Sequence, residues 1–303
     1  MPPAQPRPSP TSVGATDRPP AWPWLSRIPL PYVDARGVAR DVNAYLIAHE
    51  GRAALVDAGM PLPEHFERLE RAWIELGRPT VERILLTHGH PDHVGQAGAL
   101  ATAWGAPVHL HPLDEAIARS FAPDLPPTVA LADGEAVATP VGALRVLHLP
   151  GHTPGHVGLL LEAEGLLFSG DTVMTTSSSL VARPHGRMGD HLASLRRLLR
   201  HGVAHVAPGH GPVAAGGHER VERTLEARVR REGEVLGVLR TGPRSVSEIV
   251  ALLYHPDPEH PRHKVGRRLV EAHLDHLEAG GWAAPDDPSA TARWRYLTRS
   301  ERA

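Results

Sequence analysis

Four side chains of metal-binding type fall within six residues of this 303-residue chain, in the segment Thr87-His88-Gly89-His90-Pro91-Asp92-His93. An apolar, strand-like run precedes the segment and a helical pattern follows it, so the backbone turns here. His88 and His90 are two residues apart, and in extended backbone they project to the same side. Asp92 and His93 stand at the helix entrance, where they can face a second point nearby. The segment predicts a metal site on a strand-to-helix loop.

Three later segments repeat the pattern of a glycine and one polar ligand after an apolar strand: Pro150-Gly151-His152, Ser169-Gly170-Asp171 and Pro208-Gly209-His210. Each places one donor on a loop that leaves a strand, where rigid scaffolds usually carry catalytic groups. Together the segments supply five histidines and two aspartates, more than a closed four-ligand structural zinc needs. Seven nitrogen and oxygen donors suit two metals that share a bridging carboxylate and activate water. Imidazole-rich donors favour two Zn²⁺ ions, with iron or manganese as alternatives.

Short apolar runs alternate with helical patterns from Trp22 to about Leu147, which predicts an α/β layered architecture. Residues 1–21 are dominated by Pro, Ser, Thr, Ala and Arg, and we expect a disordered leader there. Residues 22–216 are expected to form the metal-binding domain. The pattern predicts strands at 43–49, 53–57, 83–87, 108–111, 144–149, 157–161, 166–169 and 204–207, and helices at 64–76, 93–104 and 190–200.

The pattern of residue types changes after Gly217, and residues 219–240 show a long, highly charged helical pattern. A short helix with a serine cap at Ser245 or Ser247, a helix at 264–279 and a small β-ribbon follow. This order of three helices and a ribbon is that of a winged helix. We therefore expect residues 217–303 to form a winged-helix domain.

The metal-ligand segments together resemble the metallo-β-lactamase fold superfamily over about residues 27–215. The resemblance implies an αββα sandwich with a dinuclear site at one edge of the two sheets. It also implies that a hydroxide between the metals is the nucleophile. The implied ligand sets are His88, His90 and His152 for one metal, Asp92, His93 and His210 for the other, and Asp171 as the bridge.

The resemblance also bears on side chains around the ligands. Asp57, in Leu55-Val56-Asp57-Ala58-Gly59, matches a family position that braces the histidine loop. Thr87 at the head of the motif and His156, four residues after His152, are expected to support the ligands as well. Asp92 and Asp171 are the candidate catalytic residues, Asp171 as the bridge and Asp92 also as a proton relay to the leaving group.

Departures from some branches of the superfamily narrow the chemistry. True β-lactamases of this fold use a cysteine ligand or lack the bridging aspartate, whereas this chain has Asp171 and no cysteine. Diiron oxygen- or NO-reducing relatives place a glutamate where His90 stands, which disfavours redox use of the site. Homoserine-lactone lactonases typically carry a tyrosine three residues after the bridging aspartate, and here that residue is Met174, which weakens a lactonase assignment.

Other segments resemble the lactamase-beta-like protein 2 branch. They are Met188-Gly189-Asp190-His191 with Ser194-Leu195, Arg230-Arg231-Glu232, Glu248-Ile249-Val250 and Ala272-His273-Leu274. Animal members of that branch are single-strand endoribonucleases, and bacterial and fungal relatives include thioester hydrolases. The resemblance therefore implies either activity, and it again implies a carboxy-terminal winged helix.

Three functional hypotheses follow: a metal-dependent hydrolase of esters, thioesters or lactones, a single-strand endoribonuclease, and a winged-helix DNA-binding regulator. Residues 217–303 hold 15 Lys/Arg and 14 Asp/Glu, without the basic excess that phosphate binding by a DNA-reading domain requires. Only 4% of residues are aromatic, which leaves few side chains to stack on single-stranded bases. The small-molecule acyl hydrolase is favoured, single-stranded RNA is the alternative partner, and sequence-specific DNA is the least favoured.

The loop after Asp171 offers the candidate substrate contacts Ser177, Arg183, His185 and His191, of which Arg183 or His185 could orient an anionic group. The whole chain has a formal net charge of −2, no cysteine and no apolar run of membrane-spanning length. Its first ten residues lack the apolar region of a secretory signal. These features lead us to expect a cytoplasmic protein without a membrane partner, and they leave homo-oligomerisation open.

Overall fold

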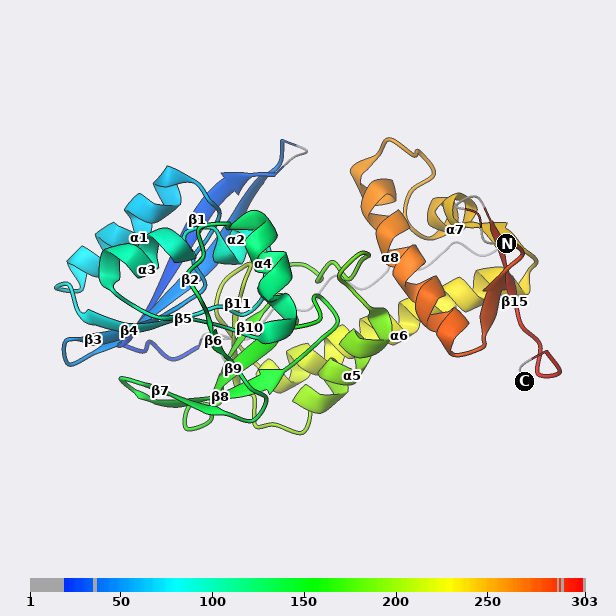
Figure 1. The fold of residues 1–303 in the computed structure, drawn as a ribbon. Coiled ribbons are helices and arrows are strands. Elements are labelled where there is room, and N and C mark those ends of the chain that lie inside the picture. Colours follow the sequence, from blue (N-terminus) through cyan, green and yellow to red (C-terminus); the bar gives the residue numbers. More distant parts are fainter. Residues whose placement is uncertain (1–18, 35–36, 288, 290–291, 302–303) are drawn as a thin grey trace, which may run out of the picture.

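Two six-stranded sheets packed face to face form the centre of residues 25–215 in the structure, a computed structural model that describes residues 19–34, 37–287, 289 and 292–301 (Figure 1). Most of the expected 1–21 leader lies outside the described residues. The first sheet has the order β1-β2-β3-β4-β5-β6 and the second the order β12-β11-β10-β9-β8-β7. The strands of these two sheets are β1 Leu25–Val33, β2 Ala39–His49, β3 Arg52–Val56, β4 Thr80–Leu85, β5 Val108–Leu110, β6 Val129–Ala130, β7 Ala136–Thr139, β8 Gly142–His148, β9 Val157–Leu161, β10 Leu166–Gly170, β11 His205–Pro208 and β12 Ala214–Ala215.

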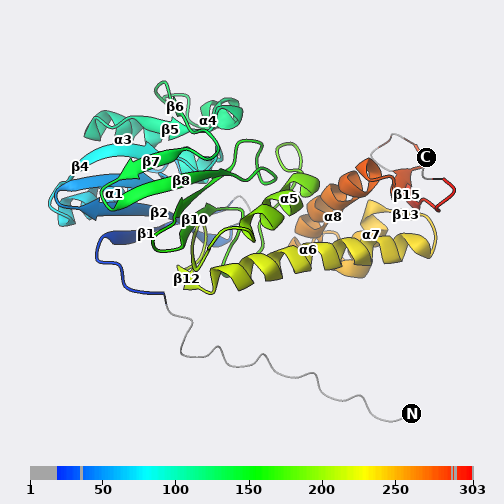
Figure 2. The ribbon, with the colours of Figure 1, turned by 90° about the horizontal axis from the view of Figure 1, so that it is seen from below.

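Helices cover the outer faces of both sheets (Figure 2). They are α1 Pro63–Glu75, α2 Pro91–Val94, α3 Ala97–Trp104, the 3₁₀ turn η1 Pro112–Asp114, α4 Glu115–Phe121, α5 Met188–Leu198 and α6 Gly217–Arg240. The eight predicted strands fall near β2 to β5 and β8 to β11, because each of these holds an apolar run that is buried on one or both faces. The strands β1, β6, β7 and β12 were not predicted.

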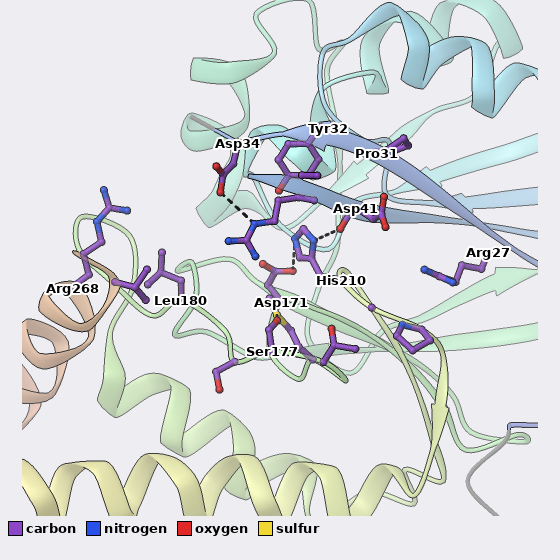
Figure 3. A pocket seen from close by; sticks show the side chains of 18 of the residues that line it. Arg27, Pro31, Tyr32, Asp34, Asp41, Asp171, Ser177, Leu180, His210 and Arg268 are labelled. Atoms are coloured by element: carbon purple, nitrogen blue, oxygen red, sulfur yellow. Dashed lines mark hydrogen bonds and ion pairs between the residues drawn. The ribbon is translucent and has the colours of Figure 1, made fainter. Parts of the chain in front are cut away.

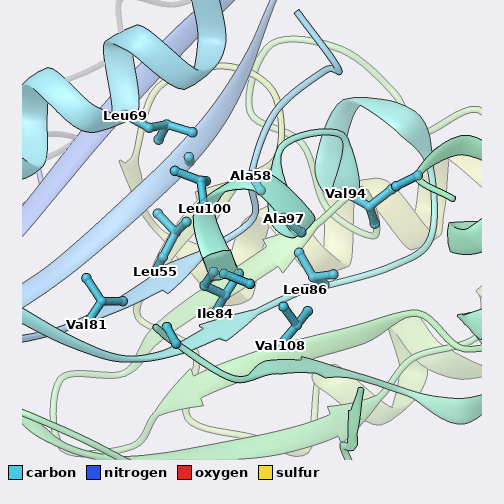
Figure 4. Packing of buried hydrophobic residues seen from close by; sticks show 14 of the residues in the cluster. Leu55, Ala58, Leu69, Val81, Ile84, Leu86, Val94, Ala97, Leu100 and Val108 are labelled. Carbon is cyan, nitrogen blue, oxygen red and sulfur yellow. The ribbon is translucent and has the colours of Figure 1, made fainter. Parts of the chain in front are cut away.

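Three apolar clusters hold the layers together. Between the sheets, Tyr45 of β2 meets Phe168 of β10 edge to face, with ring centroids 5.3 Å apart. On the outer face of the first sheet, Leu69 of α1 and Leu100 of α3 pack in one cluster with Leu55 of β3 (Figure 4). The third cluster joins the second sheet to α5 and α6. The expected αββα sandwich is confirmed.

The helix predicted for residues 93–104 is wrong as a single element, because the structure divides it into α2 and α3. The break falls at Gly95 and Gln96. A β-carbon on Gly95 would lie 2.2 Å from the backbone nitrogen of Pro61, so the chain before α1 packs directly on this turn. The Gly95 N–H donates to the Gly59 carbonyl at 2.7 Å as well as to Pro91. These contacts with the segment before α1 are tertiary, and helical periodicity does not reveal them.

Residues after α6 form α7 Val246–Leu253, α8 Pro261–Ala279 and a small sheet of order β13-β15-β14, with β13 Arg244–Ser245, β14 Ala283–Pro285 and β15 Arg293–Tyr296. Ser245 caps α7 through a capping box with Glu248. A separate apolar cluster includes Val235 and Leu239 from the second half of α6 and Val270 from α8. Assignment of this segment to the winged-helix class stays a prediction. Within the described residues, no helix combines the length and the apolar character needed to cross a membrane.

Candidate metal centre

The polar loops that leave β4, β8, β10 and β11 meet at one end of the sandwich. β10 and β11 are parallel neighbours, with Gly170 opposite Pro208, so that Asp171 and His210 leave the sheet side by side. Gly209 allows this close approach, because a β-carbon there would lie 2.5 Å from Asp171 Oδ1 and 2.7 Å from the His93 ring. The sequence thus delivers donors from distant segments to one point.

The donors form two groups suited to one cation each. His88, His90 and His152 make the first: His90 Nδ1 lies 3.1 Å from His88 Nε2 and 2.8 Å from His152 Nε2. Asp92, His93 and His210 make the second, in which Asp92 Oδ2 lies 3.2 Å from His210 Nε2 and 3.9 Å from His93 Nε2. In each group the lone pairs of three side chains converge, as coordination of one cation requires.

The carboxylate of Asp171 lies between the two groups. Its Oδ2 is 3.5 Å from His152 Nε2, while its Oδ1 is 3.4 Å from His93 Nε2 and 3.7 Å from His210 Nε2. Both Asp171 Oδ1 and His93 Nε2 are buried and have no hydrogen-bond partner among the described residues. Unsatisfied buried polar atoms are costly in a folded protein, and a cation between them would satisfy both.

The remaining ring nitrogens of the clustered histidines also fit metal binding. Metal-ligating histidines usually donate their second ring N–H to an oxygen, which fixes the tautomer and the ring orientation. Four such contacts occur here: His88 Nδ1 to Thr87 Oγ1 at 3.1 Å, His93 Nδ1 to Asp57 Oδ2 at 2.7 Å, His152 Nδ1 to the Leu180 carbonyl at 3.0 Å, and His210 Nδ1 to the Asp41 carbonyl at 2.6 Å.

The electrostatics of the cluster divide along the same two groups. Burial and the neighbouring imidazoles lower the pKa of His88, and burial with His152 lowers that of His90 to about 3, so both rings are neutral, as ligands must be. Burial opposes charge at His210 too, but Asp171 and Asp92 raise its pKa to about 8. Negative charge is therefore concentrated on Asp92 and Asp171. A metal cation bound there would balance this charge in place of the proton on His210.

Three supporting residues named from the sequence contact the cluster. Asp57 accepts from the Thr87 N–H at 2.8 Å and the Thr87 hydroxyl at 2.9 Å, besides its contact with His93. His156 is fully buried, and its Nε2 accepts from the Asp171 N–H at 3.0 Å. These contacts fix the backbone on both sides of the site.

Sequence reasoning missed Asp114, which ends η1 and is fully buried. Its Oδ2 accepts from the Gly89 N–H at 2.7 Å and the Thr153 hydroxyl at 2.6 Å, while its Oδ1 accepts from the Gly155 N–H at 2.6 Å. One carboxylate therefore ties the His88–His90 loop to the His152 loop. Nothing in the sequence around Asp114 signals contacts with residues 25 to 41 positions away.

Tyr32 and Arg228 were also missed. Tyr32, on β1, places its hydroxyl 3.4 Å from Asp92 Oδ2, and burial together with Asp92 raises the Tyr32 pKa. Arg228, in the middle of α6, is buried and donates to the Ser179 carbonyl, next to the carbonyl that contacts His152. Burial lowers the Arg228 pKa.

The four candidate substrate contacts divide in the structure. Ser177 lines a cavity of about 1210 Å³ that reaches Asp171 and His210 (Figure 3). His185 Nδ1 lies 3.3 Å from His90 Nε2. Arg183 instead forms an ion pair with Asp275 of α8 and lines a second cavity of about 580 Å³. His191 is fully buried, and neither ring nitrogen has a hydrogen-bond partner among the described residues.

The sandwich and its two donor groups define an α/β protein with a candidate metal centre. The chain belongs to the metallo-beta-lactamase superfamily, whose model matches residues 37–210. A metallo-beta-lactamase family protein from Thermus thermophilus has the same fold, with a TM-score of 0.75 and 29% identity over 91% of this chain and 99% of that one.

Three curated relatives extend the comparison. A beta-lactamase-like protein 2 homolog of Caenorhabditis elegans is 29% identical over 65% of each chain, which is just under two thirds of its length. An atrochrysone carboxyl ACP thioesterase of Emericella nidulans is 26% identical over 86% of this chain and 81% of its own. A hydroxyacylglutathione hydrolase of Anaeromyxobacter dehalogenans is 45% identical over 46% of this chain and 49% of its own. These similarities support a hydrolase.

Proposed function

We propose that this protein is a two-metal hydrolase of acyl thioesters, with zinc as the metal. His88, His90 and His152 would hold one ion, Asp92, His93 and His210 the other, and Asp171 would bridge them. The observation that carries the proposal is the position of the Asp171 carboxylate, within 3.4–3.7 Å of imidazole nitrogens from both groups.

When bound here, two cations would supply Lewis acidity and would lower the pKa of water. The chain's own residues supply the rest. The large cavity admits a substrate beside Asp171 and His210, and the Tyr32 hydroxyl faces the same space. Asp92, within reach of that hydroxyl, is positioned to pass a proton toward a leaving group.

Thioesters are favoured over other carbonyl substrates for two reasons. A thiolate is a good leaving group and needs less help from an acid than an alkoxide or an amine does, and the Asp57 carboxylate beside the donor cluster is already hydrogen-bonded to Thr87 and His93. Two relatives by sequence are named as a hydroxyacylglutathione hydrolase and a thioesterase, and both names describe hydrolysis of a thioester.

Hydrolysis of a thioester panel by zinc-loaded protein tests the proposal, with thiol release followed by a colorimetric reagent. We expect turnover by the wild type and its loss in Asp171→Ala together with loss of the second equivalent of zinc. Asp92→Ala serves as a contamination control. Full turnover by a variant that retains one zinc would refute the two-metal assignment. Cleavage of a fluorescent single-stranded RNA, lost in Asp92→Ala, with no thioester turnover would replace the substrate class.

We also propose that residues 22–216 form the catalytic domain and residues 217–303 a winged-helix domain attached through α6. The order of α6, α7, α8 and the three-stranded sheet supports this assignment, as does the separate apolar cluster around Val235 and Val270. The structures of free-standing winged helices offer the direct test, through superposition of residues 241–301.

A further inference from the structure

The cavity beside the metal centre is closed on one side by α8, a helix of the carboxy-terminal segment. Its walls include Tyr32 of β1, Leu180 of the loop after Asp171, and Lys264, Val265 and Arg268 of α8. In Figure 3, Leu180 and Arg268 lie on one side of Asp171 and His210, and Arg27 lies on the other. A substrate whose carbonyl lies at Asp171 can therefore extend toward α8.

The α8 wall carries two positive charges, neither of which is held in a buried ion pair among the described residues. Arg268 is exposed and makes no ion pair among the described residues. Lys264, one turn earlier on the same face, pairs with Glu259 at 2.8 Å, but their side chains are 53% and 85% exposed. Exposed pairs of this kind contribute little and are easily exchanged for another anion.

The other charged side chains of the cavity wall outside the metal centre lie on or next to β1 and β2. Arg40 pairs with Asp34 at 3.3 Å, and Arg27 donates to the Asn43 side chain at 2.9 Å. Asp41 is the remaining acidic side chain of the wall outside the metal centre, and its carbonyl contacts His210. On the α8 side of the cavity, the available cations are thus Arg268, which forms no ion pair among the described residues, and Lys264, whose pair with Glu259 is exposed.

The position of Arg267, next to Arg268 on α8, shows that only one face of the helix lines the cavity. Arg267 pairs with Glu271, four residues on, at 2.9 Å and does not line the cavity. Residues 264 and 268 are four apart and therefore share a face. Val265 lies beside them, half-buried, and offers an apolar surface next to the two cations.

We propose that Lys264 and Arg268 form a subsite for the anionic group of the substrate's thiol carrier. This inference rests on the proposed thioester hydrolase function. A phosphate or carboxylate on the carrier would lie between the two side chains, while the acyl carbonyl lies at Asp171 and His210. Arginine and lysine one helical turn apart suit an oxyanion, because both donate charge-assisted hydrogen bonds to its oxygens.

The test compares three thioesters of one acyl group: that of coenzyme A, which carries phosphates, that of glutathione, which carries carboxylates, and that of N-acetylcysteamine, which is neutral. Arg268→Ala and the double variant with Lys264→Ala are expected to raise KM for a charged thioester about 10-fold, with kcat unchanged. The neutral thioester should keep its KM. Arg267→Ala is the matched control and should leave all three substrates unaffected.

The experiment distinguishes a phosphate from a carboxylate as the bound anion. It also distinguishes failure of the subsite from failure of the proposed thioester hydrolase function. A loss confined to the coenzyme A thioester identifies a phosphate site, and a loss confined to the glutathione thioester a carboxylate site. Equal changes for neutral and charged thioesters, or none for either, would overturn the subsite. Binding of free coenzyme A and free glutathione by calorimetry gives a readout without turnover: binding lost in Arg268→Ala supports the subsite even where no thioester is hydrolysed, and absence of binding by the wild type refutes it.

Discussion

Replacement of Asp114 by alanine would cut the tie between the two loops that carry His88, His90 and His152. The carboxylate is fully buried and accepts three hydrogen bonds, from the Gly89 N–H, the Thr153 hydroxyl and the Gly155 N–H. The contact is close on both sides, since a β-carbon on Gly89 would lie 2.8 Å from the Asp114 carbonyl oxygen and one on Gly155 2.7 Å from its nitrogen. Neither loop has room to shift inward and replace the lost acceptor.

The size of the expected stability loss depends on whether each of the three donors can find another acceptor. A hydrogen bond to a charged acceptor contributes about 1.5–3 kcal/mol, and the Thr153 hydroxyl can rotate to another acceptor whereas the two backbone N–H groups cannot. Because the two buried backbone N–H groups lose their acceptor, we expect Asp114→Ala to lower the free energy of unfolding by about 3–5 kcal/mol. Asp114→Asn keeps one acceptor oxygen and places an NH₂ against a donor, so we expect a loss of about 1–2 kcal/mol.

Urea unfolding of the metal-free protein measures the stability loss, and competition with a zinc chelator measures affinity at each site. Because Asp114 supports the His88, His90 and His152 group, we expect the zinc affinity of that site to fall about 10- to 100-fold, and the other site to change less. Glu115→Ala, which removes an exposed pair with Arg119, is the control and should change stability by less than about 1 kcal/mol. A loss below about 1 kcal/mol in Asp114→Ala, or equal weakening of both zinc sites, would refute this reasoning.

Three further predictions concern the chain and its metal. Arg228→Met should weaken zinc binding several-fold, because it removes the bond to the Ser179 carbonyl on the loop that orients His152, and an unchanged chelator titration would contradict it. Burial opposes ionisation of Glu232, but hydrogen bonds from His273 and His276 hold its pKa below the ordinary 4.5. The folded pKa is thus the lower one, so this stabilisation is present above the unfolded pKa and is lost as pH falls through the folded pKa. The gap in unfolding free energy between wild type and Glu232→Gln should shrink below about pH 4.5, and a gap constant from pH 7 to 3 would count against it. Chelation of the metal should lower Tm and added zinc should restore it, since a ligand bound only by the folded state stabilises that state; a Tm insensitive to both would argue against a metal site.

The donor cluster could be predicted because its signal is local. Each candidate ligand follows an apolar strand within a few residues, and parallel neighbours such as β10 and β11 bring the ends of those strands to one edge. The strand cores were predictable for the same reason, since Val157–Leu161 is a continuous apolar run that ends in polar residues on both sides. Features that depend on residues close together in the sequence, or on the two-residue period of a strand, can therefore be predicted from the sequence.

The side chains that orient the ligands could not be predicted, because their partners are far away in sequence. Asp114 meets Gly155, and Arg228 meets Ser179, through contacts that only the folded chain defines. The break between α2 and α3 has the same origin, in the packing of Gly95 against Pro61. Arg183 is a related case: its place on the loop after Asp171 made it a candidate for substrate binding, but Asp275 of α8 is its ion-pair partner.

The course of α6 explains why the carboxy-terminal segment can serve as a fixed wall of the cavity. In its first half Val221 is fully buried with Leu195 of α5 in the cluster under the second sheet, and in its second half Val235 belongs to the core shared with α8. One continuous helix therefore has residues in both cores, and Arg228 lies between those residues and contacts the loop beside His152. Movement of α8 away from the metal centre would have to bend this helix or expose one of its buried faces, both of which cost free energy. The helix that carries Lys264 and Arg268 is thus tied to the domain that carries Asp171, and a subsite on these two side chains would select carriers by length as well as by charge.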